Sequence, residues 1–514
     1  MAQHEHDRYV FINTAPLYLD SYLRKNRPEV HSSIEWAKLQ FIEKSPTQLA
    51  HEIDELGIDI LLVGLYIWNV DRALVLLDTI KQLAHRPITI IAGGPSVEIH
   101  RNRNWLFDNP AVDFAVYGQG ERAFVDVLDD LYYNKPLSLL GSKNVAWINN
   151  GRLKVADYEF IRNKDGSPFC ESQHLLEQIV ADPEYKYHSF EISYETSWGC
   201  AYGCTFCDWN SGLDPKVSIR KYKHEDELDL LGRLGIVRIH MSDANFGQAP
   251  QDIEVAKTYA RLKQEKGYQF EIINNNFAKV NKKAVFEIAD ILLNAGILVS
   301  LKFAVQDTHK SVLDDIRRPD VPWPEHKDMI DRLQQQHPDT DFWIELILGL
   351  PGQTRAGWEE NIVECAPYSL SVHHWSILPN APAGYDKEYQ DQMKLRVLKT
   401  NLVNYEIPMD TVVETYSYNF DDYAYFNLLT NVFVRFATRT SFDRRELIET
   451  IKSSSLLQPA LDKIKHMILT SQGEQVDVIC NEFVADLVKE NYKKSPAEYR
   501  QLMHELMITK GLLK

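Results

Sequence analysis

Along the first 140 residues, short apolar runs alternate with longer segments in which apolar residues recur every three or four positions. The short runs predict buried strands, and the longer segments predict amphipathic helices. This alternation predicts a parallel, doubly wound sheet with a ligand at the carboxyl ends of its strands. The expected strands are 8–16 (with its following loop), 58–65, 87–92 and 113–117, and the expected helices are 45–56, 70–83 and a third that ends at 131.

The alternation resumes at residue 190 and continues to residue 378, and its repeated strand–helix units fit a partial parallel barrel. The expected strands are 190–196, 237–243, 269–274, 299–305, 342–348 and 373–378. The expected helices are 225–234, 250–265, 282–294, 325–336 and 356–365.

The two alternating regions are joined by a different pattern. Residues 145–155 predict a β-hairpin that turns at Asn149-Asn150-Gly151, and the polar stretch 156–187 predicts a linker. From 384 to 514 the pattern is mainly helical, near 387–403, 420–436, 444–454, 459–470 and 496–507.

Composition narrows the class of protein. The chain has 514 residues and a formal net charge of −17. An acidic balance favours solubility and disfavours a nucleic-acid partner, because phosphate binding needs a basic stripe. No apolar run is long enough to span a bilayer, and the first residues lack the apolar core of a signal peptide. Six cysteines in this length do not indicate a disulfide framework, so we expect a soluble, cytosolic protein.

Three of the six cysteines follow the expected strand 190–196 at once, as Cys200, Cys204 and Cys207 in the spacing C-x3-C-x2-C. Three thiolates on one loop can hold three irons of a [4Fe–4S] cube and leave the fourth iron open to a ligand. The alternative is a zinc site or a group of buried structural thiols. Zinc sites usually have four ligands, and Cys365 and Cys480 stand alone in the sequence.

The form C-x3-C-x-aromatic-C resembles the signature of the radical S-adenosylmethionine (SAM) enzymes. The resemblance implies that the three cysteines hold the cluster, that the open iron chelates SAM, and that Phe206 lies beside the adenine. It also implies a (β/α)6 barrel. Turns at the strand ends resemble the family's SAM contacts: Asp243 and Asn245 in the place of the turn that bonds the amino group, Asn276 for the ribose or carboxylate, and Gln306 for the ribose. Asp243 could instead cap the next helix, and the asparagines could form a hydrogen-bonded turn.

Further stretches resemble the same family. They are 314–318, which ends in Ile-Arg-Arg, 347–354, which contains Gly-Leu-Pro-Gly-Gln-Thr, and 378–382 at the end of the sixth strand. The stretch 414–418 resembles one found just after the barrel. Aromatic residues of the C-terminal segment could line the pocket, although core packing is the more ordinary expectation for Tyr416, Tyr418, Tyr423 and Tyr425.

The N-terminal region resembles the cobalamin (B12)-binding domain that precedes the barrel in one radical SAM subfamily. The resemblance is carried by a Gly-Gly-Pro turn after one strand and a Gly-Gln-Gly-Glu turn after the next. The D-x-H-x-x-G motif is missing, because the loop after the first strand has no histidine, so we expect base-off cobalamin. The implied cobalamin contacts are Thr14, Ala15, Tyr66, Trp68, Asn69, Gly93, Gly94, Pro95, Tyr117, Gly118, Gln119, Gly120 and Glu121.

These resemblances imply an α/β protein: a doubly wound, Rossmann-like B12-binding domain (1–140), a linker with the hairpin (141–187), the partial barrel (188–383) and a mainly helical segment (384–514). They imply a [4Fe–4S] cluster, SAM and cobalamin as cofactors, and methylation of an unactivated carbon of a small molecule or peptide through a 5′-deoxyadenosyl radical and methylcobalamin. The electron donor would be a flavodoxin or ferredoxin. The sequence singles out no catalytic acid or base.

Other functions stay open at this point. A cobalamin-containing radical SAM enzyme could end in ring contraction, cyclisation or rearrangement without methyl transfer. A cobalamin sensor would have no need of an open iron site. A tRNA methylthiotransferase fits poorly with the acidic balance and with the lack of an N-terminal three-cysteine domain.

Overall fold

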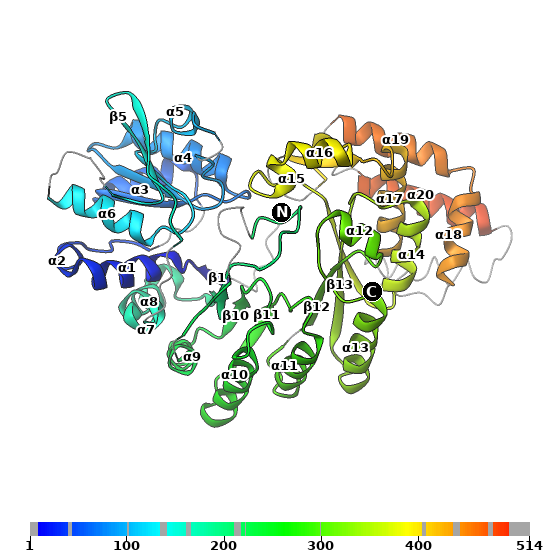
Figure 1. Ribbon diagram of the computed structural model, residues 1–514, viewed down its shortest axis with the longest axis horizontal. Helices are drawn as coiled ribbons and strands as arrows, with labels where there is room; N and C mark the ends of the chain where they lie inside the picture. The colour runs from blue at the N-terminus through cyan, green and yellow to red at the C-terminus, as the bar shows by residue number, and fades with distance from the viewer. Residues whose placement is uncertain are drawn as a thin grey trace. The chain divides into compact units, whose positions relative to one another are not determined.

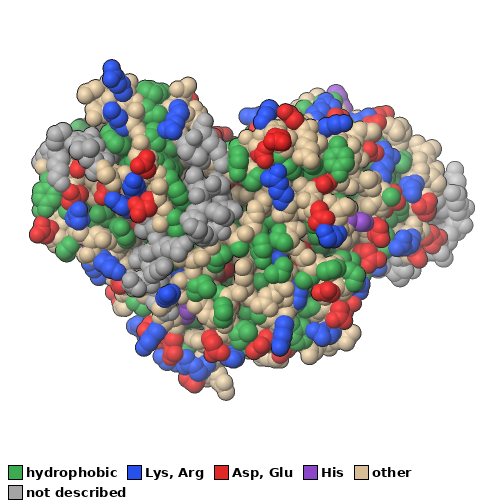
Figure 2. All heavy atoms as spheres, viewed as in Figure 1, with side chains coloured by type: hydrophobic (Ala, Val, Ile, Leu, Met, Phe, Trp, Pro, Cys, Tyr) green, Lys and Arg blue, Asp and Glu red, His purple; other side chains and the backbone are tan. Residues whose placement is uncertain are grey.

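The computed structural model describes residues 9–39, 44–99, 102–133, 141–160, 166–209, 217–221, 223–298, 300–402, 408–434, 443–470 and 476–492. The chain divides into two compact units. The first consists of Met1–Gly199, Leu213–Asn275 and Ile291–Leu298, and the second of Cys200–Gly212, Asn276–Asp290 and Val299–Lys514. Among the described residues, no helix is long and apolar enough to cross a membrane. On the face drawn in Figure 2, acidic and basic side chains are interspersed.

The first unit contains a five-stranded sheet in the order β2-β3-β4-β5-β6 (Figure 1). The strands β2 (Ile60–Gly64), β3 (Thr89–Gly93) and β4 (Phe114–Val116) are parallel. The expected hairpin is present as β5 (Val145–Asn149) and β6 (Arg152–Val155), and β5 pairs antiparallel with β4. The hairpin therefore completes this sheet at one edge.

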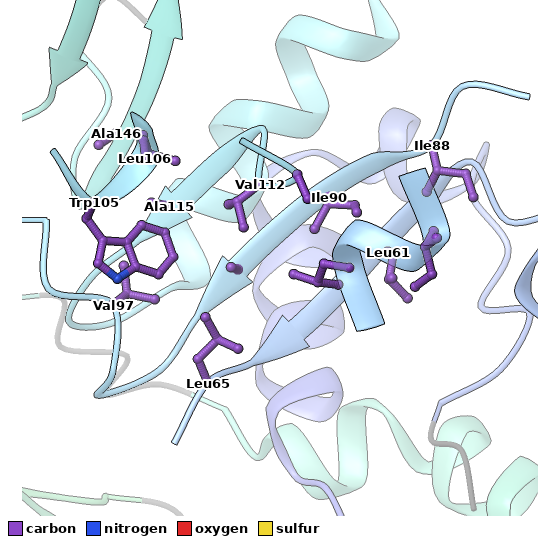
Figure 3. Packing of buried hydrophobic residues seen from close by; sticks show 14 of the residues in the cluster. Leu61, Leu65, Ile88, Ile90, Val97, Trp105, Leu106, Val112, Ala115 and Ala146 are labelled. Carbon is purple, nitrogen blue, oxygen red and sulfur yellow. The ribbon is translucent and has the colours of Figure 1, made fainter. Parts of the chain in front are cut away.

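Helices cover both faces of the five-stranded sheet. On one face, α3 (Pro46–Glu55), α4 (Val70–Leu83) and α5 (Trp105–Asp108) bury an apolar core around Leu61, Ile90 and Trp105 (Figure 3). On the other face, α1 (Ala15–Asn26), α2 (Pro28–His31) and α6 (Glu121–Tyr132) bury a second core. The β strands carry apolar residues toward both faces, which is why they read as continuous apolar runs.

The first strand does not belong to this sheet. The segment β1 (Tyr9–Ile12) pairs in parallel with β7 (Ser189–Tyr194), in a four-stranded sheet of order β1-β7-β10-β11. The prediction that residues 8–16 supply a strand of the N-terminal sheet is therefore wrong. Four apolar residues can pair with any open sheet edge, so their pattern does not identify the partner strand. As a consequence, Thr14 and Ala15 lie at the start of α1 and not at an end of the five-stranded sheet.

The strands expected from residue 190 onward are present in two parallel sheets. In the first unit, β7 is joined by β10 (Arg238–Met241) and β11 (Glu271–Asn274), with α9 (His224–Arg233) and α10 (Asp252–Lys266) between them in sequence. In the second unit, β12 (Ser300–Gln306), β13 (Asp341–Leu348) and β14 (Ser369–His374) pair side by side. The connecting helices are α11 (Lys282–Asn294), α12 (Lys310–Asp315), α13 (Trp323–Gln336) and α14 (Arg355–Cys365).

The expected linker 156–187 contains short helices. They are α7 (Pro168–Glu171), α8 (Gln173–Ala181) and the 3-10 turn η1 (Pro183–Tyr185). Phe169 and Leu175 are buried, and α7 contacts both α1 and α9. The few apolar residues that make these contacts are scattered among polar ones. The composition of this stretch therefore predicted only a linker.

The described part of the C-terminal segment is mainly helical, as expected. It contains α15 (Pro382–Tyr385), α16 (Lys387–Met393), α17 (Phe420–Val432), α18 (Arg444–Ser453), α19 (Leu457–Leu469) and α20 (Val476–Tyr492). The expected helix 387–403 ends at Met393, and β15 (Arg396–Thr400) instead pairs antiparallel with β16 (Met409–Glu414). The expected helix 496–507 lies outside the described residues. Tyr418, Tyr423 and Tyr425 are buried, whereas Tyr416 is exposed.

Candidate functional site

The cysteine-bearing loop leaves and re-enters the first unit at a short antiparallel pair of strands, β8 (Ser197–Trp198) and β9 (Ser218–Ile219). Next to β9, the fully buried Arg220 forms an ion pair with Glu227 of α9 at 2.8 Å. Its guanidinium also donates to the Glu195 carbonyl oxygen. It lies 5.3 to 5.8 Å from the ring centroids of Phe169, Tyr194 and Trp198. Arg220 therefore links both ends of the loop to β7 and α9.

A second buried carboxylate holds the segment between β7 and β8. Asp243, at the end of β10, accepts hydrogen bonds from the backbone N–H and the hydroxyl of both Thr196 and Ser197, at 2.8 to 3.1 Å. Asp252 accepts from the Thr196 hydroxyl and from the backbone of Gly247 and Ala249. Burial raises the pKa of Asp252 to about 6. Asp243 thus positions the strand end and does not cap α10, while its predicted contact with SAM stays a prediction.

In the second unit, the cysteine loop is fixed to its surroundings through Thr205. The Thr205 N–H donates to the Ile316 carbonyl oxygen at 2.9 Å, and the Thr205 carbonyl oxygen accepts from the Ala383 N–H at 2.8 Å. The Thr205 hydroxyl and the Tyr389 hydroxyl are 2.9 Å apart. Phe206 packs against the apolar cluster that contains Ile316 and Tyr389. Thr205 and Phe206, between Cys204 and Cys207, are therefore held in one position.

The three loop cysteines are free thiols; Cys200 and Cys204 are buried and Cys207 is partly buried. Burial raises the pKa of the Cys204 thiol, and the Arg318 and Lys279 charges oppose this rise. Burial likewise raises the pKa of Cys207 to about 11. A bound metal would deprotonate such thiols, because ligating cysteines bind as thiolates.

The three thiols are of the ligand type that holds iron–sulfur clusters. In the described ranges, no three His, Cys, Asp or Glu side chains are grouped closely enough to hold one metal ion. Thiolates around a cluster bind different iron atoms, so they need not converge on one point. Among the described residues, the buried Nε of Arg318 has no hydrogen-bond partner, and the Arg318 charge lowers the pKa of Cys204.

The turn after β12 carries the predicted SAM contact Gln306 in a strained conformation. Gln306 is a non-glycine residue with φ of +69°, at a break in the β12–β13 register. Such strain persists only where the surroundings enforce it, and it concentrates at functional sites. Here the next residue, Asp307, is buried and accepts from Gln353 at 2.8 Å and from Asn361 at 2.7 Å.

The turn after β13 is locked to the same network. The Gln353 side-chain oxygen accepts from the backbone N–H groups of Gly349 and Leu350. The Tyr418 hydroxyl donates to the Gly349 carbonyl oxygen at 2.7 Å, and Ser417 accepts from the Gly352 N–H at 2.9 Å. The stretch 414–418 therefore packs on the Gly-Leu-Pro-Gly-Gln-Thr turn.

The predicted SAM residues are distributed over the two units. Phe206, Asn276 and Gln306 belong to the second unit together with the three cysteines, whereas Asp243 and Asn245 belong to the first. Asn245 is buried. Beside Asn276, the buried Asn275 has a side-chain N–H2 group without a hydrogen-bond partner among the described residues. The amide-rich turn after β11 therefore has a donor that no described residue accepts from.

At the end of β2, two aromatic rings form an exposed platform. Tyr66 and Trp68 stack with ring centroids 4.7 Å apart and an interplanar angle of 11°. Trp68 is 56% exposed. Asn69 fixes the loop, because it accepts from the Tyr66 N–H at 2.8 Å and donates to the Gly64 carbonyl oxygen at 3.0 Å. Trp68 is therefore not a core residue.

The other strand ends of this sheet carry the two glycine turns. Gly94 has φ of +106°, and a Cβ there would lie 2.5 Å from the Leu65 carbonyl oxygen. Gly118 has φ of +69°, and a Cβ there would lie 2.6 Å from the Tyr158 ring. Both turns therefore require glycine. Glu121 begins α6, and burial raises its pKa. Tyr117 is a core residue whose hydroxyl donates to the Ala156 carbonyl oxygen.

Sequence reasoning missed the residues that hold the site together. Arg220, Asp252, Lys279 and Asp307 were not singled out, and Glu195, whose pKa burial and Asp243 raise to about 8, was read only as a strand residue. Each of them lies within about twenty residues of a recognised motif. For Glu195, Arg220 and Asp307 the available signal was a charged residue directly after an apolar strand.

Comparison with known proteins tests the resemblance to the radical SAM enzymes. Residues 194–364 match the model described as the Radical SAM superfamily. The chain is 29% identical over 333 residues to the cobalamin-dependent radical SAM methyltransferase TokK of Streptomyces tokunonensis. It is 28% identical over 333 residues to a 2-(S-pantetheinyl)-carbapenam-3-carboxylate methyltransferase of Streptantibioticus cattleyicolor.

Each alignment with the curated relatives covers 63% of this chain and 48% of the relative. The chain therefore spans about half the length of the curated relatives it matches. The resemblance to radical SAM enzymes of the cobalamin-dependent group is confirmed.

Solved structures agree on the fold. The cobalamin-dependent SAM radical enzyme OxsB aligns with a TM-score of 0.59 and 15% identity, over 98% of this chain and 81% of that one. The radical SAM methyltransferase TsrM of Kitasatospora setae aligns with a TM-score of 0.53 and 13% identity, over 76% and 78%. The α/β fold expected from sequence is therefore confirmed, and at these identities the likeness concerns the fold alone.

We expect Arg220→Met to destabilise the first unit strongly, because it leaves the buried Glu227 carboxylate unpaired. Breaking a buried pair costs about 3–5 kcal/mol. The matched control is Arg233→Met at the end of α9. The pair of Arg233 with Asp229 is half exposed, so its loss should cost about 1 kcal/mol or less. Urea unfolding followed by circular dichroism measures both. Equal losses in the two variants would contradict the role given to Arg220.

His309 makes stability pH-dependent near the Gln306 turn. Hydrogen bonding to Asp307 raises the pKa of His309 to about 9, against burial, with Glu360 adding to the rise. The folded value lies above the unfolded value of about 6.5, so the stabilisation is complete below about pH 6.5 and disappears as pH rises through about 9.

We therefore expect His309→Gln to lower the free energy of unfolding by about 1 kcal/mol near neutral and acidic pH, and to have almost no effect above about pH 10. Urea titrations over this pH range measure the difference. His373→Gln is the control, since His373 is exposed and bonds to Ser371. A loss for His309→Gln that is constant with pH would rule out this assignment.

Proposed function

We propose that this protein is a cobalamin-dependent radical SAM enzyme that methylates an unactivated carbon of a small molecule or peptide. The observation that carries the proposal is the anchored loop with three free, largely buried cysteines inside the radical SAM domain. The likeness to two curated methyltransferases supports methyl transfer as the outcome. Ring contraction or rearrangement without methyl transfer has no such support.

The finer architecture is part of the proposal. We infer that the parallel sheets β7-β10-β11 and β12-β13-β14 are the two halves of a partial (β/α)6 barrel, with 188–383 as its extent. We infer that the five-stranded sheet, together with its hairpin, is the B12-binding domain. Parallel strands with connecting helices support the first inference, and helices on both faces support the second.

In this proposal, Cys200, Cys204 and Cys207 hold a [4Fe–4S] cluster, and Phe206, Asn276 and Gln306 contact SAM. When bound, the cluster and SAM supply the substrate radical, and cobalamin supplies the methyl group. The chain's own contribution is placement. The strained Gln306 is held by the Asp307 network. Asp243 is fixed by the bonds that it accepts from Thr196 and Ser197, and with the buried Asn245 it is proposed for the SAM amino group.

For cobalamin, the stacked Tyr66 and Trp68 offer a flat apolar platform beside the Gly93-Gly94-Pro95 turn. The backbone bond from the Leu65 N–H to the Gly93 carbonyl oxygen, at 2.7 Å, joins the two loops. A corrin ring has large apolar faces, so a stacked aromatic pair suits one of them without an axial ligand. The Gly118-Gln119-Gly120-Glu121 turn is proposed for the polar rim of the cofactor.

The reduced state of the cluster needs a low-potential donor, and we propose a flavodoxin or ferredoxin acting in the cytoplasm. All six cysteines are free, as suits a reducing compartment. The acidic net charge of −17 makes a nucleic-acid substrate a poor fit.

Anaerobic reconstitution with iron, sulfide and hydroxocobalamin tests the proposal. We expect about four irons and one cobalamin per chain. Cys204→Ala should lose the cluster and keep cobalamin, whereas the control Cys365→Ala, a buried cysteine on α14, should keep both. With substrate, equal amounts of S-adenosylhomocysteine and 5′-deoxyadenosine indicate methylation, and 5′-deoxyadenosine alone indicates rearrangement. Iron in Cys204→Ala equal to wild type would refute the cluster assignment.

The aromatic platform has its own test. Trp68→Ala should weaken cobalamin binding by about tenfold or more, since stacking on a large ring is lost, and should leave the iron content unchanged. The control is Phe107→Ala. Phe107 is another exposed aromatic residue and lies on α5, which packs on the same five-stranded sheet. Titration of the cobalamin absorbance measures both affinities. Unchanged affinity in Trp68→Ala would remove the platform from the cobalamin site.

A further inference from the structure

One face of the sheet β12-β13-β14 packs against helices of the second unit. The rings of Phe303 on β12 and His326 on α13 have centroids 6.0 Å apart. On β14, the Nδ1 atom of His374 lies 2.9 Å from the hydroxyl of Tyr423 on α17. Successive side chains of a strand point to opposite faces of the sheet. The residues next to Phe303 and His374 on their strands therefore lie on the other face.

This other face, which we call the second face, carries polar and aromatic side chains. Its residues are Lys302 on β12, Trp343 and Glu345 on β13, and Ser371 and His373 on β14. Trp343 is the register partner of Lys302, and Ser371 is the register partner of Glu345. Lys302 and Glu345 are thus diagonal neighbours, with Cα atoms about 8 Å apart at ordinary strand spacings.

The two charges of the second face are not paired by the fold. Lys302 and Glu345 are both half-buried. Within the described ranges, neither side chain forms an ion pair or a hydrogen bond, with the other or with a third residue. Charged side chains that are largely removed from water are usually paired, because desolvation costs free energy. A cation and an anion left unpaired on one sheet face therefore indicate that something outside the described chain pairs them.

The four-stranded sheet of the first unit shows the ordinary arrangement. Arg238 on β10 pairs with Glu191 on β7 at 2.9 Å and with Glu271 on β11 at 2.6 Å. His240, also on β10, lies 3.0 Å from Glu191. These partly buried charges satisfy one another, so they need no ligand. The sheet β12-β13-β14 differs because Lys302 and Glu345 have no such partners.

A molecule that carries both charges would pair Lys302 and Glu345 at once. An ammonium group donates to a carboxylate, and such charge-assisted hydrogen bonds are the strong ones. The half-buried Trp343, next to both residues on the same face, offers an apolar surface. We propose that the second face binds a zwitterion, with its carboxylate at Lys302, its ammonium group at Glu345 and its apolar part against Trp343.

The proposed site names a substrate class for the enzyme. The molecule to be methylated would be an amino acid, or a derivative in which the amine and the carboxylate are both free. This inference rests on the proposed function, since it assigns the site to that reaction. The methionine part of SAM carries the same two groups, so the experiment has to separate the substrate from SAM.

The test uses calorimetry on the full chain, reconstituted anaerobically with iron and sulfide. The probes are L-leucine, L-phenylalanine and L-tryptophan, each compared with its N-acetyl derivative, which lacks the ammonium group, and its amide, which lacks the carboxylate. We expect the wild type to bind at least one free amino acid at millimolar concentration, and both derivatives about tenfold or more weakly. Lys302→Met should bind the amino acid and its amide alike. Glu345→Gln should bind the amino acid and its N-acetyl derivative alike.

Stability separates a binding role from a structural one. Without ligand, Lys302→Met and Glu345→Gln should leave the free energy of unfolding unchanged or raise it, because each removes a half-buried charge that has no described partner. Urea unfolding measures this difference. The controls are Lys283→Met and Glu287→Gln, which change exposed residues of α11 and should alter neither binding nor stability.

The outcomes distinguish this inference from the proposed function. A wild-type chain that takes up no iron refutes the proposed function, whatever its affinity for amino acids. A chain with full iron that binds none of the three amino acids overturns this inference alone. Wild-type selectivity in Lys302→Met and Glu345→Gln, or a loss of stability in both, also overturns it. If the two variants weaken SAM binding and leave amino-acid binding unchanged, the second face belongs to SAM and the inference is again overturned.

Discussion

The arrangement depends on keeping three thiols of one short loop in fixed positions, and buried polar contacts provide most of that restraint. In the first unit, the ends of the loop are held by the Arg220–Glu227 pair and by the bonds that Asp243 accepts. In the second unit, its middle is held through Thr205. A buried ion pair adds little net stability, because desolvation offsets the attraction. It does penalise every conformation in which the partners separate, and this penalty favours one loop geometry.

Buried polar contacts also fix the turns after β12 and β13 in the second unit. Asp307 and Gln353 join the ends of β12 and β13, and the left-handed backbone of Gln306 follows from this constraint. The C-terminal stretch 414–418 bonds to the glycines of the second turn. Residues far apart in sequence therefore support one set of strand ends, and the C-terminal segment is part of that support. Buried carboxylates and amides are used here because each must find its partners when water is excluded.

Local patterns predicted well whatever depends on neighbouring residues. The helix expected over 282–294 is α11, and the helix expected over 70–83 is α4. Ser45 caps α3 with a reciprocal bond to Gln48. The turn at Asn150 and Gly151 has the left-handed backbone of a tight hairpin. Where a choice depended on distant parts of the chain, prediction failed: β1 joined another sheet, and β15 replaced the end of an expected helix.

The sequence by itself determined the chemistry: the spacing of Cys200, Cys204 and Cys207, the glycine turns and the alternation of strands and helices are all local properties. Only the tertiary structure decided which charges surround that chemistry. Arg220 and Asp307 are ordinary charged residues in the sequence. They become important because folding removes water and leaves Arg220 beside the Glu227 carboxylate and Asp307 beside the Gln353 amide. Electrostatic effects of this kind depend on distance and burial, and neither quantity can be read from the order of residues.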